Sequence, residues 1–281
     1  MKNCILGLLL IFCQLSVAAQ AKQEEVKLWE NGAPGFEHKK DIPERAKDWW
    51  VRDIHNPSIT IFRPENPNGK IVLVIPGGVH SSMVFNSEGA RAAKYLNKLG
   101  LTAAVLKYRL FREEGSDYNQ NHPTEVALRA MRLIRANAKN WGIDQNRVGI
   151  LAFSAGGEVA NWLTFGDHKS IELSTDKIDQ QSAKPDFLIE VYPGPLGIPK
   201  SVSKNAPPAF LVASNNDECC SETILDLLVA YRNAKADVEA HFYSKDGHAF
   251  NMGTRSEFQS IKGWPERMKD WLADHHYFQS K

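Results

Sequence analysis

Three residues of this 281-residue chain have the types needed for covalent catalysis by a serine: Ser154, Asp217 and His248, in that order. A serine hydroxyl is a poor nucleophile unless a histidine takes its proton, and the histidine needs a carboxylate that holds its tautomer. Such a set performs acyl transfer through a covalent acyl-enzyme. We therefore predict Ser154 as nucleophile, His248 as general base and Asp217 as the acid that orients His248.

The serine lies in the stretch 151–157, which reads Leu-Ala-Phe-Ser-Ala-Gly-Gly and continues an apolar run, 148–153. This pattern indicates a nucleophile elbow, in which a strand turns sharply at the serine into a helix. Small residues are needed there because the strand and the helix pass close together. The usual pattern is G-x-S-x-G, and Ala152 stands at its first position, so the match is partial. An ordinary strand-to-helix turn with a serine cap is the alternative that this stretch leaves open.

The predicted acid and base each follow a strand. The apolar run 210–213 leads through Ser-Asn-Asn to Asp217, and the run 238–242 is followed by Lys-Asp-Gly and His248. The carboxyl ends of parallel strands lie at one edge of a sheet, so both residues can meet the serine there. The order serine, acid, histidine is also that of α/β-hydrolases.

Other residues compete for the same roles. A lone aspartate after a strand is usually a turn former, and Glu218 and Asp246 are rival acids. His80 is the only other histidine near the expected site. The order and the places of the three residues together favour the triad over these alternatives.

A glycine-containing loop, Pro-Gly-Gly-Val-His, follows the apolar run 71–75. We expect the backbone N–H groups of Gly78, Val79 and Ala155 to form an oxyanion hole, because glycine permits inward turns and a helix begins after the serine. A β-branched residue rarely adopts a positive φ, so we expect a negative φ at Val79. We also expect its side chain and that of His80 to face the substrate. A plain strand-ending turn is the alternative.

A sheet flanked by helices is needed to bring these residues together. Apolar runs predict strands at 58–62, 71–75, 102–106, 148–153, 187–191, 210–213 and 238–242. Helical patterns lie at 87–99, from 123 to 141, after the elbow, between the last two strands and at the C-terminus. This alternation predicts one α/β domain over residues 22–281, an α/β-hydrolase fold with a mostly parallel central sheet. The polar stretch 166–185 is either a cap over the site or a surface loop.

The first 21 residues have the features of a secretory signal peptide. Lys2 gives a positive start, an apolar run extends from 5 to 17, and small residues precede position 22. The run is shorter than the roughly 20 apolar residues that span a bilayer. We therefore expect export to the periplasm or the medium and no stable membrane insertion; an uncleaved anchor is the alternative.

The composition restricts the partners and cofactors that we expect. The chain has 34 basic and 33 acidic residues and a net charge of +1, which gives no reason to expect a nucleic-acid partner. No metal-ligand spacing has enough members for a zinc site, and we expect neither metal nor cofactor. Of the four cysteines, Cys219 and Cys220 remain after signal cleavage; we expect buried thiols, with a disulfide between them as the alternative. The oligomeric state stays open.

Motifs along nearly the whole mature chain resemble those of the acetyl xylan esterase-like group of exported bacterial α/β-hydrolases. The matching stretches are Leu28-Trp29-Glu30-Asn31-Gly32-Ala33-Pro34-Gly35, Pro76-Gly77-Gly78, Glu88-Gly89, Leu106-Lys107-Tyr108-Arg109-Leu110, Trp141-Gly142-Ile143-Asp144, Phe153-Ser154-Ala155-Gly156-Gly157, Pro185-Asp186-Phe187 and Gly247-His248-Ala249-Phe250. The resemblance implies hydrolysis of carboxylic esters, with acetylated carbohydrate, xylan-type or oligosaccharide, as the substrate.

The sequence departs from that family at three positions near the site. Val79 and His80 stand where the family has a third glycine and an aromatic residue, and Glu158 stands where histidine is common. We assign His80 and Glu158 to the substrate pocket. The departures bear on substrate class and on rate more than on fold.

Three other functions compete with an esterase. Some members of the family are labelled xylanases, but glycoside cleavage normally needs a pair of carboxylates flanking the bond, and the sequence gives no evidence for one. A serine peptidase of this fold usually carries a further gating domain, for which the chain has no room. A binding protein with a decayed hydrolase site is the remaining alternative.

Overall fold

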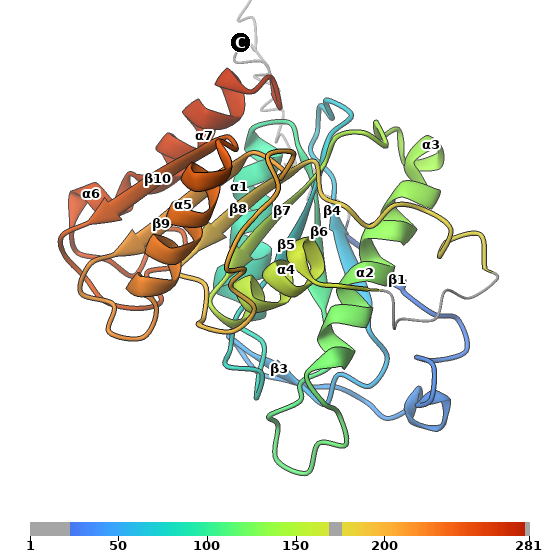
Figure 1. Cartoon of the computed structure of the whole chain (residues 1–281). Coiled ribbons are helices and arrows are strands. Elements are labelled where there is room, and N and C mark those ends of the chain that lie inside the picture. The colour runs from blue at the N-terminus through green and yellow to red at the C-terminus, as the bar shows by residue number, and fades with distance from the viewer. Residues whose placement is uncertain (1–22, 169–175, 279–281) are drawn as a thin grey trace, which may run out of the picture.

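The computed structural model describes residues 23–168 and 176–278. An eight-stranded sheet lies at its centre, with the strands in the order β1-β4-β6-β5-β7-β8-β9-β10 (Figure 1). The strands are β1 (Gln23–Lys27), β4 (Ser58–Phe62), β5 (Ile71–Ile75), β6 (Thr102–Lys107), β7 (Val148–Phe153), β8 (Phe187–Val191), β9 (Ala209–Ser214) and β10 (Val238–Tyr243). The short strands β2 (Arg45–Ala46) and β3 (Val51–Arg52) pair separately.

Most of the sheet is parallel. β1 with β4 and β4 with β6 are antiparallel pairs, and every other pair of neighbours is parallel. All five residues of β5 are fully buried, as expected for a strand that is covered on both faces. The predicted fold class is therefore confirmed, and the carboxyl ends of the parallel strands share one edge.

Helices cover both faces of the sheet. Figure 1 shows α2 and α4 in front of the sheet and α1 behind it. The helices are α1 (Arg91–Lys98), α2 (Asn121–Ala136), α3 (Ala138–Trp141), α4 (Ala155–Phe165), α5 (Ser221–Ala234), α6 (Gln259–Lys262) and α7 (Trp264–Asp274). Apolar side chains of α2, α4 and α5 form one core with the sheet, and those of α1, α6 and α7 form the other.

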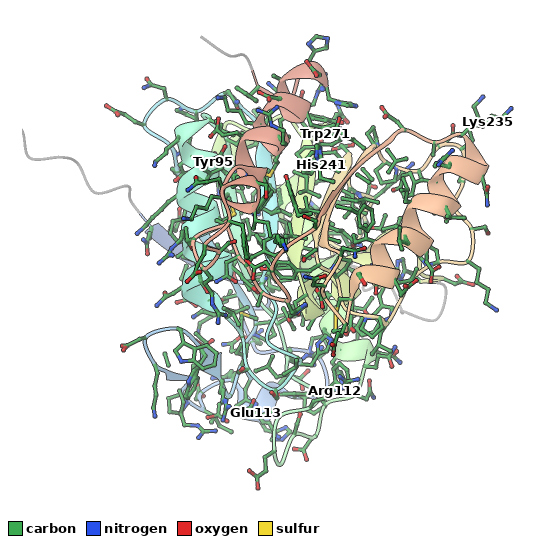
Figure 2. All side chains as sticks on the ribbon, turned by 90° about the vertical axis from the view of Figure 1, so that its left-hand side faces the viewer. Tyr95, Arg112, Glu113, Lys235, His241 and Trp271 are labelled. Atoms are coloured by element: carbon green, nitrogen blue, oxygen red, sulfur yellow. A yellow bond between two sulfur atoms is a disulfide. The ribbon has the colours of Figure 1, made fainter. Side chains whose placement is uncertain are left out.

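Aromatic side chains fill much of the second core. Trp271 of α7 is 2% exposed, and its ring centroid lies 5.7 Å from that of Phe210 on β9. Phe210 in turn contacts His241 of β10, so α7 covers the last two strands of the sheet (Figure 2). No helix in the described ranges is long and apolar enough to cross a membrane.

The seven predicted strands are confirmed, with ends that differ by at most one residue. The sequence did not predict β1, because its polar, mostly exposed residues carry no apolar pattern and are held by backbone pairing with β4. The predicted helix 87–99 consists of a π-helical segment, η2 (Phe85–Ala90), followed by α1. The widened turn brings Gly89 so close to the sheet that a Cβ there would lie 2.7 Å from Val105 Cγ1.

Two other predictions concern residues outside the described ranges. The predicted signal peptide, 1–21, lies wholly outside them, and the polar stretch 166–185 lies partly outside them. Both stay predictions.

Candidate active site

Ser154 lies on a sharp turn between β7 and α4, as the sequence predicts. Its backbone has φ 50° and ψ −124°, a strained conformation for a residue with a side chain. A Cβ at Gly156 would lie 2.1 Å from the carbonyl oxygen of Ile75, so only glycine fits where the helix crosses the neighbouring strand. The local sequence folds this way because small residues allow that close approach, and the turn holds the serine side chain at the edge of the sheet.

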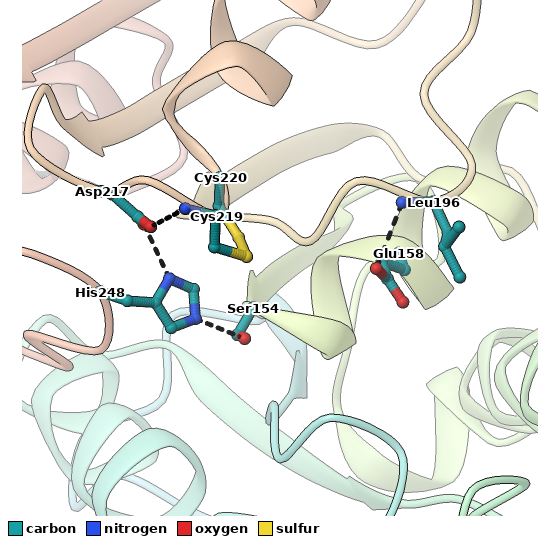
Figure 3. Close-up of a disulfide and its surroundings, with 7 residues drawn as sticks. All are labelled: Ser154, Glu158, Leu196, Asp217, Cys219, Cys220 and His248. Carbon is teal, nitrogen blue, oxygen red and sulfur yellow. Dashed lines mark hydrogen bonds and ion pairs between the residues drawn. A yellow bond between two sulfur atoms is a disulfide. The ribbon is translucent and has the colours of Figure 1, made fainter.

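The structure brings together the three residues of the predicted triad (Figure 3). Ser154 Oγ and His248 Nε2 lie 2.7 Å apart, and His248 Nδ1 lies 2.7 Å from Asp217 Oδ2. Asp217 is 1% exposed, whereas the imidazole of His248 is 31% exposed. Among the described residues, Glu218 and Asp246 make no hydrogen bond or ion pair with His248. The geometry is that of a base between a nucleophile and an orienting acid.

Backbone contacts hold the carboxylate of Asp217 in place after β9. Its N–H donates to the Ser214 carbonyl at 3.1 Å, which closes the turn. The N–H of Cys219 donates to Oδ1 at 3.2 Å and leaves Oδ2 for the histidine. Each carboxylate oxygen thus has its own donor, which fixes the direction of the acid.

Cys219 and Cys220 are joined by a disulfide directly after the acid (Figure 3). The prediction of buried thiols is wrong, and the alternative of a disulfide is correct. Cys220 is 1% exposed, but Cys219 is exposed, and the turn between Asp217 and α5 puts the two sulfurs next to each other. Adjacent cysteines are compatible with either state in the sequence, and the backbone of this turn decides between them.

The loop after β5 is tightly closed. The N–H groups of Ser81 and Ser82 both donate to the carbonyl of Gly78 at 3.1 Å. Val79 has φ 52° and His80 has φ 59°, so the prediction of a negative φ at Val79 is wrong. The closed turn requires this backbone: a Cβ at Gly78 itself would lie 2.0 Å from the Ser82 carbonyl oxygen.

The predicted oxyanion donors come from the loop after β5 and from the first residue of α4. In the described ranges, the N–H groups of Gly78, Val79 and Ala155 donate to no other group. Ala155 is the first residue of α4, where helix N–H groups have no intrahelical partner and the helix dipole is positive. Val79 is 61% exposed, and the position of its side chain toward the substrate stays a prediction. These N–H groups are therefore available to an anionic oxygen.

His80 and Glu158 form a buried pair with each other. His80 Nε2 lies 2.6 Å from Glu158 Oε2, and their side chains are 0% and 5% exposed. Glu158 Oε1 also accepts the N–H of Leu196 at 3.2 Å (Figure 3). His80 stacks on Trp162 with ring centroids 5.7 Å apart. This buried pairing contradicts the prediction that His80 faces the substrate and the assignment of His80 and Glu158 to the substrate pocket.

Tyr192, which follows β8, contacts the histidine and was missed by the sequence analysis. Its ring centroid lies 4.8 Å from that of His248, at an interplanar angle of 62°. Burial raises the pKa of its hydroxyl well above the ordinary value, so the hydroxyl stays protonated. No motif signals this residue, since its contact with His248 arises only where two loops meet.

One group of side chains near the triad has the composition of a metal site. Donor atoms of Asp217, Cys219, Cys220 and His248 all lie within 4.8 Å of one another. The two sulfurs are bonded to each other, and the carboxylate is hydrogen-bonded to the imidazole. With the disulfide formed, the two cysteines offer no thiolate to a metal, and Asp217 is bonded to His248.

Residues 59–198, about half of the chain, match the family model described as BD-FAE. The chain is 29% identical over 213 residues to an acetylxylan esterase of Xylanibacter ruminicola, a match over 69% of this chain and 43% of the relative. It is 35% identical over 124 residues to endo-1,4-beta-xylanase B of Butyrivibrio fibrisolvens, over 43% of this chain and 19% of that protein. The chain thus spans less than half the length of these two relatives.

Solved structures resemble the fold over nearly the full chain. An acetyl ester-xyloside bifunctional hydrolase of Caldicellulosiruptor lactoaceticus matches with a TM-score of 0.72 and 23% identity, over 91% of this chain and 97% of that chain. The carboxylesterase Cest-2923 of Lactobacillus plantarum matches with a TM-score of 0.66 and 17% identity, over 85% and 99%. At these identities the structural likeness concerns the fold.

Proposed function

We propose that the chain belongs to the acetyl xylan esterase-like group of α/β-hydrolases and that it is a serine esterase that hydrolyses carboxylic esters. The observation that carries the proposal is the hydrogen-bonded series Ser154, His248 and Asp217 beside free backbone N–H groups. This series supplies a nucleophile, a base and an orienting acid, which together suffice for acyl transfer without a cofactor.

In the proposed acylation step, Ser154 Oγ attacks the carbonyl carbon of the ester. His248 Nε2 takes the hydroxyl proton as the bond forms, and Asp217 stabilises the resulting imidazolium through Nδ1–H. The carbonyl oxygen becomes an oxyanion and accepts hydrogen bonds from the N–H groups of Gly78, Val79 and Ala155. The imidazolium then protonates the leaving alcohol, and an acyl-enzyme remains on Ser154.

Hydrolysis of the acyl-enzyme repeats the same steps with water. His248 takes a proton from the water, whose oxygen attacks the acyl carbon, and the oxyanion again uses the three N–H groups. Collapse of this intermediate releases the carboxylic acid, and the proton returns to Ser154 Oγ. Since Asp217 is buried and His248 is part-exposed, water can reach the base while the acid stays fixed.

We propose acetylated carbohydrate, either xylan-type or oligosaccharide, as the substrate. The names of two relatives support this choice: one is an acetylxylan esterase and the other an acetyl ester-xyloside bifunctional hydrolase. Glycoside cleavage is not part of the proposal, because the residues assembled around Ser154 are those of acyl transfer.

The experiment that tests this function measures turnover on esters of increasing acyl length and acetate release from acetylated xylo-oligosaccharides. We expect turnover of p-nitrophenyl acetate and release of acetate from the oligosaccharides. Ser154→Ala should lower kcat by a factor on the order of a thousand or more while the thermal midpoint stays unchanged. A fluorophosphonate probe should label Ser154 alone.

Matched variants of the three nearby carboxylates test the role of Asp217. Asp217→Asn should lower kcat by a factor of about a thousand or more, because the histidine loses its orienting acceptor. Glu218→Gln and Asp246→Asn serve as controls and should leave kcat within about threefold.

Wild-type turnover in Ser154→Ala would refute the proposed function, and cleavage of peptides in place of esters would favour a peptidase. Ligand binding without turnover would indicate a decayed site.

A further inference from the structure

Glu88 is a buried carboxyl group that the proposed chemistry does not use. It lies in η2, the π-helical segment that precedes α1, and it is 2% exposed. Among the described residues it has no salt bridge with a cation. π-Helical turns occur frequently at functional sites, because the extra residue in the turn redirects a side chain. From this turn the Glu88 carboxyl reaches the loop after β5 at Gly77 and the loop after β10 at Asn251.

Three donors surround the two oxygens of Glu88. The N–H of Gly77 donates to Oε2 at 2.7 Å, and Tyr192 Oη donates to Oε1 at 3.0 Å. When the side-chain amide of Asn251 is assigned with its nitrogen toward Glu88, the orientation that satisfies its neighbours, it donates to Oε1 at 3.0 Å and to the Ala249 carbonyl at 3.2 Å. A buried acceptor with this many donors forms the centre of a fixed hydrogen-bond network.

The network joins the two loops that act on the substrate. Gly77 directly precedes the first oxyanion donor, Gly78. Asn251 is three residues beyond His248, and its backbone N–H donates to Tyr192 Oη at 2.9 Å. The ring of Tyr192 also lies against the imidazole of His248. Glu88 is therefore the link between the oxyanion loop and the histidine loop.

Both loops contain backbone that needs such a restraint. Val79 and His80 have positive φ in the oxyanion loop, and Ala249 (62°) and Asn251 (53°) have it in the histidine loop. Each strained residue costs on the order of 1–3 kcal/mol and persists only where its surroundings over-determine it. The space beside Gly77 is equally restricted, since a Cβ there would lie 2.7 Å from Ser154 Cβ and 2.9 Å from Glu88 Oε2.

We propose that Glu88 is a positioning residue, which aligns the oxyanion donors with His248 by holding Gly77, Tyr192 and Asn251. The inference rests on the proposed esterase function and adds a residue that never contacts the substrate. A small displacement of either loop would weaken interactions that form only in the transition state. The loss should therefore appear in kcat, while KM, which reflects binding of the ground state, should change little.

The test compares two variants of buried glutamates. Glu88→Gln keeps the size of the side chain but replaces one carboxylate oxygen by an NH2 donor, so it can no longer accept from Gly77 and from Tyr192 on two separate oxygens. Glu190→Gln is the matched control, because Glu190 is also fully buried but lies on β8 against Asn161 of α4. On p-nitrophenyl acetate we expect kcat to fall at least about tenfold in Glu88→Gln and KM to stay within about threefold. Glu190→Gln should keep kcat within about twofold.

A second variant removes the link from the other side. Tyr192→Phe keeps the ring against His248 but loses the hydroxyl that joins Glu88 to Asn251. We expect the same selective loss in kcat, smaller than in Glu88→Gln because the bond to Gly77 remains. If Glu88→Gln fails to fold, this variant carries the test alone.

Two results would overturn the inference: a kcat within threefold of wild type in the folded variants, or an equal loss in Glu190→Gln. Ser154→Ala, measured in parallel, separates this outcome from a failure of the proposed function. If Ser154→Ala is inactive and Glu88→Gln is fully active, the esterase stands and only the positioning role is lost.

Discussion

At the scale of single residues, Val79 shows how a closed turn overrides the preference of a side chain. A β-branched residue in the left-handed region costs roughly 1–2 kcal/mol, yet Val79 has φ 52° because the loop closes on the Gly78 carbonyl. The N–H of Val79 nevertheless donates to no described group, so the backbone can serve an oxyanion. The backbone strain at Val79 thus lowers the stability of the loop but does not reduce the number of N–H groups available to an oxyanion.

Substitution of Val79 by glycine tests this conclusion. Glycine adopts the same backbone without strain, so the donors should keep their places and only the exposed wall of the site should change. We expect Val79→Gly to change kcat on p-nitrophenyl acetate by less than about tenfold and to alter the preference among acyl groups. A rise of about a hundredfold or more would mean that valine had disabled the oxyanion hole, and a decayed site would become the better description.

At the scale of elements, a buried acid distinguishes β8 from its apolar neighbours. Glu190 lies in the middle of the sheet and its oxygen is 3.4 Å from the Asn161 amide of α4. Burial raises the pKa of Glu190 to about 8. In the unfolded chain the same carboxyl titrates near its ordinary value, so between these two values the folded state binds more protons than the unfolded state.

The pH dependence of stability follows from that difference. A raised acid pKa stabilises the fold at low pH, and the contribution is lost as pH rises toward about 8, by up to about 1.4 kcal/mol per pH unit. Glu190→Gln cannot ionise, so its free energy of unfolding should fall less steeply than that of wild type between pH 5 and about 8. Urea unfolding at several pH values checks this prediction. Parallel curves for both proteins would show that Glu190 does not titrate in this range.

At the scale of the whole molecule, we propose that the protein is exported to an oxidising compartment, on the basis of its predicted signal peptide and its disulfide. Structural disulfides form and persist in oxidising environments, and Cys219 and Cys220 are joined here. We expect the exported protein to begin near Gln20 or Lys22. N-terminal sequencing of the protein from the periplasm or medium measures this directly, and an intact Met1 would contradict it. Alkylation before reduction should leave both cysteines unlabelled.

The sequence by itself determined seven of the eight strands of the central sheet, its mostly parallel order and the three residues of the predicted triad. Apolar runs such as 71–75 mark strands that are buried on both faces, and their pattern depends only on neighbours in the chain. Ser154, Asp217 and His248 could be found because each follows such a run, and parallel strands end at one edge. This part of the site is encoded locally, so one sequence suffices to predict it.

The tertiary structure alone decided the contacts that shape the site around those three residues. His80 and Glu158 are 78 positions apart, and Glu88 and Tyr192 are 104 positions apart, so no periodicity links them. The backbone at Val79 follows from closure of its loop, and the disulfide follows from the turn after Asp217. These features depend on how loops from different strands pack at one edge, and the packing exists only once the sheet has formed.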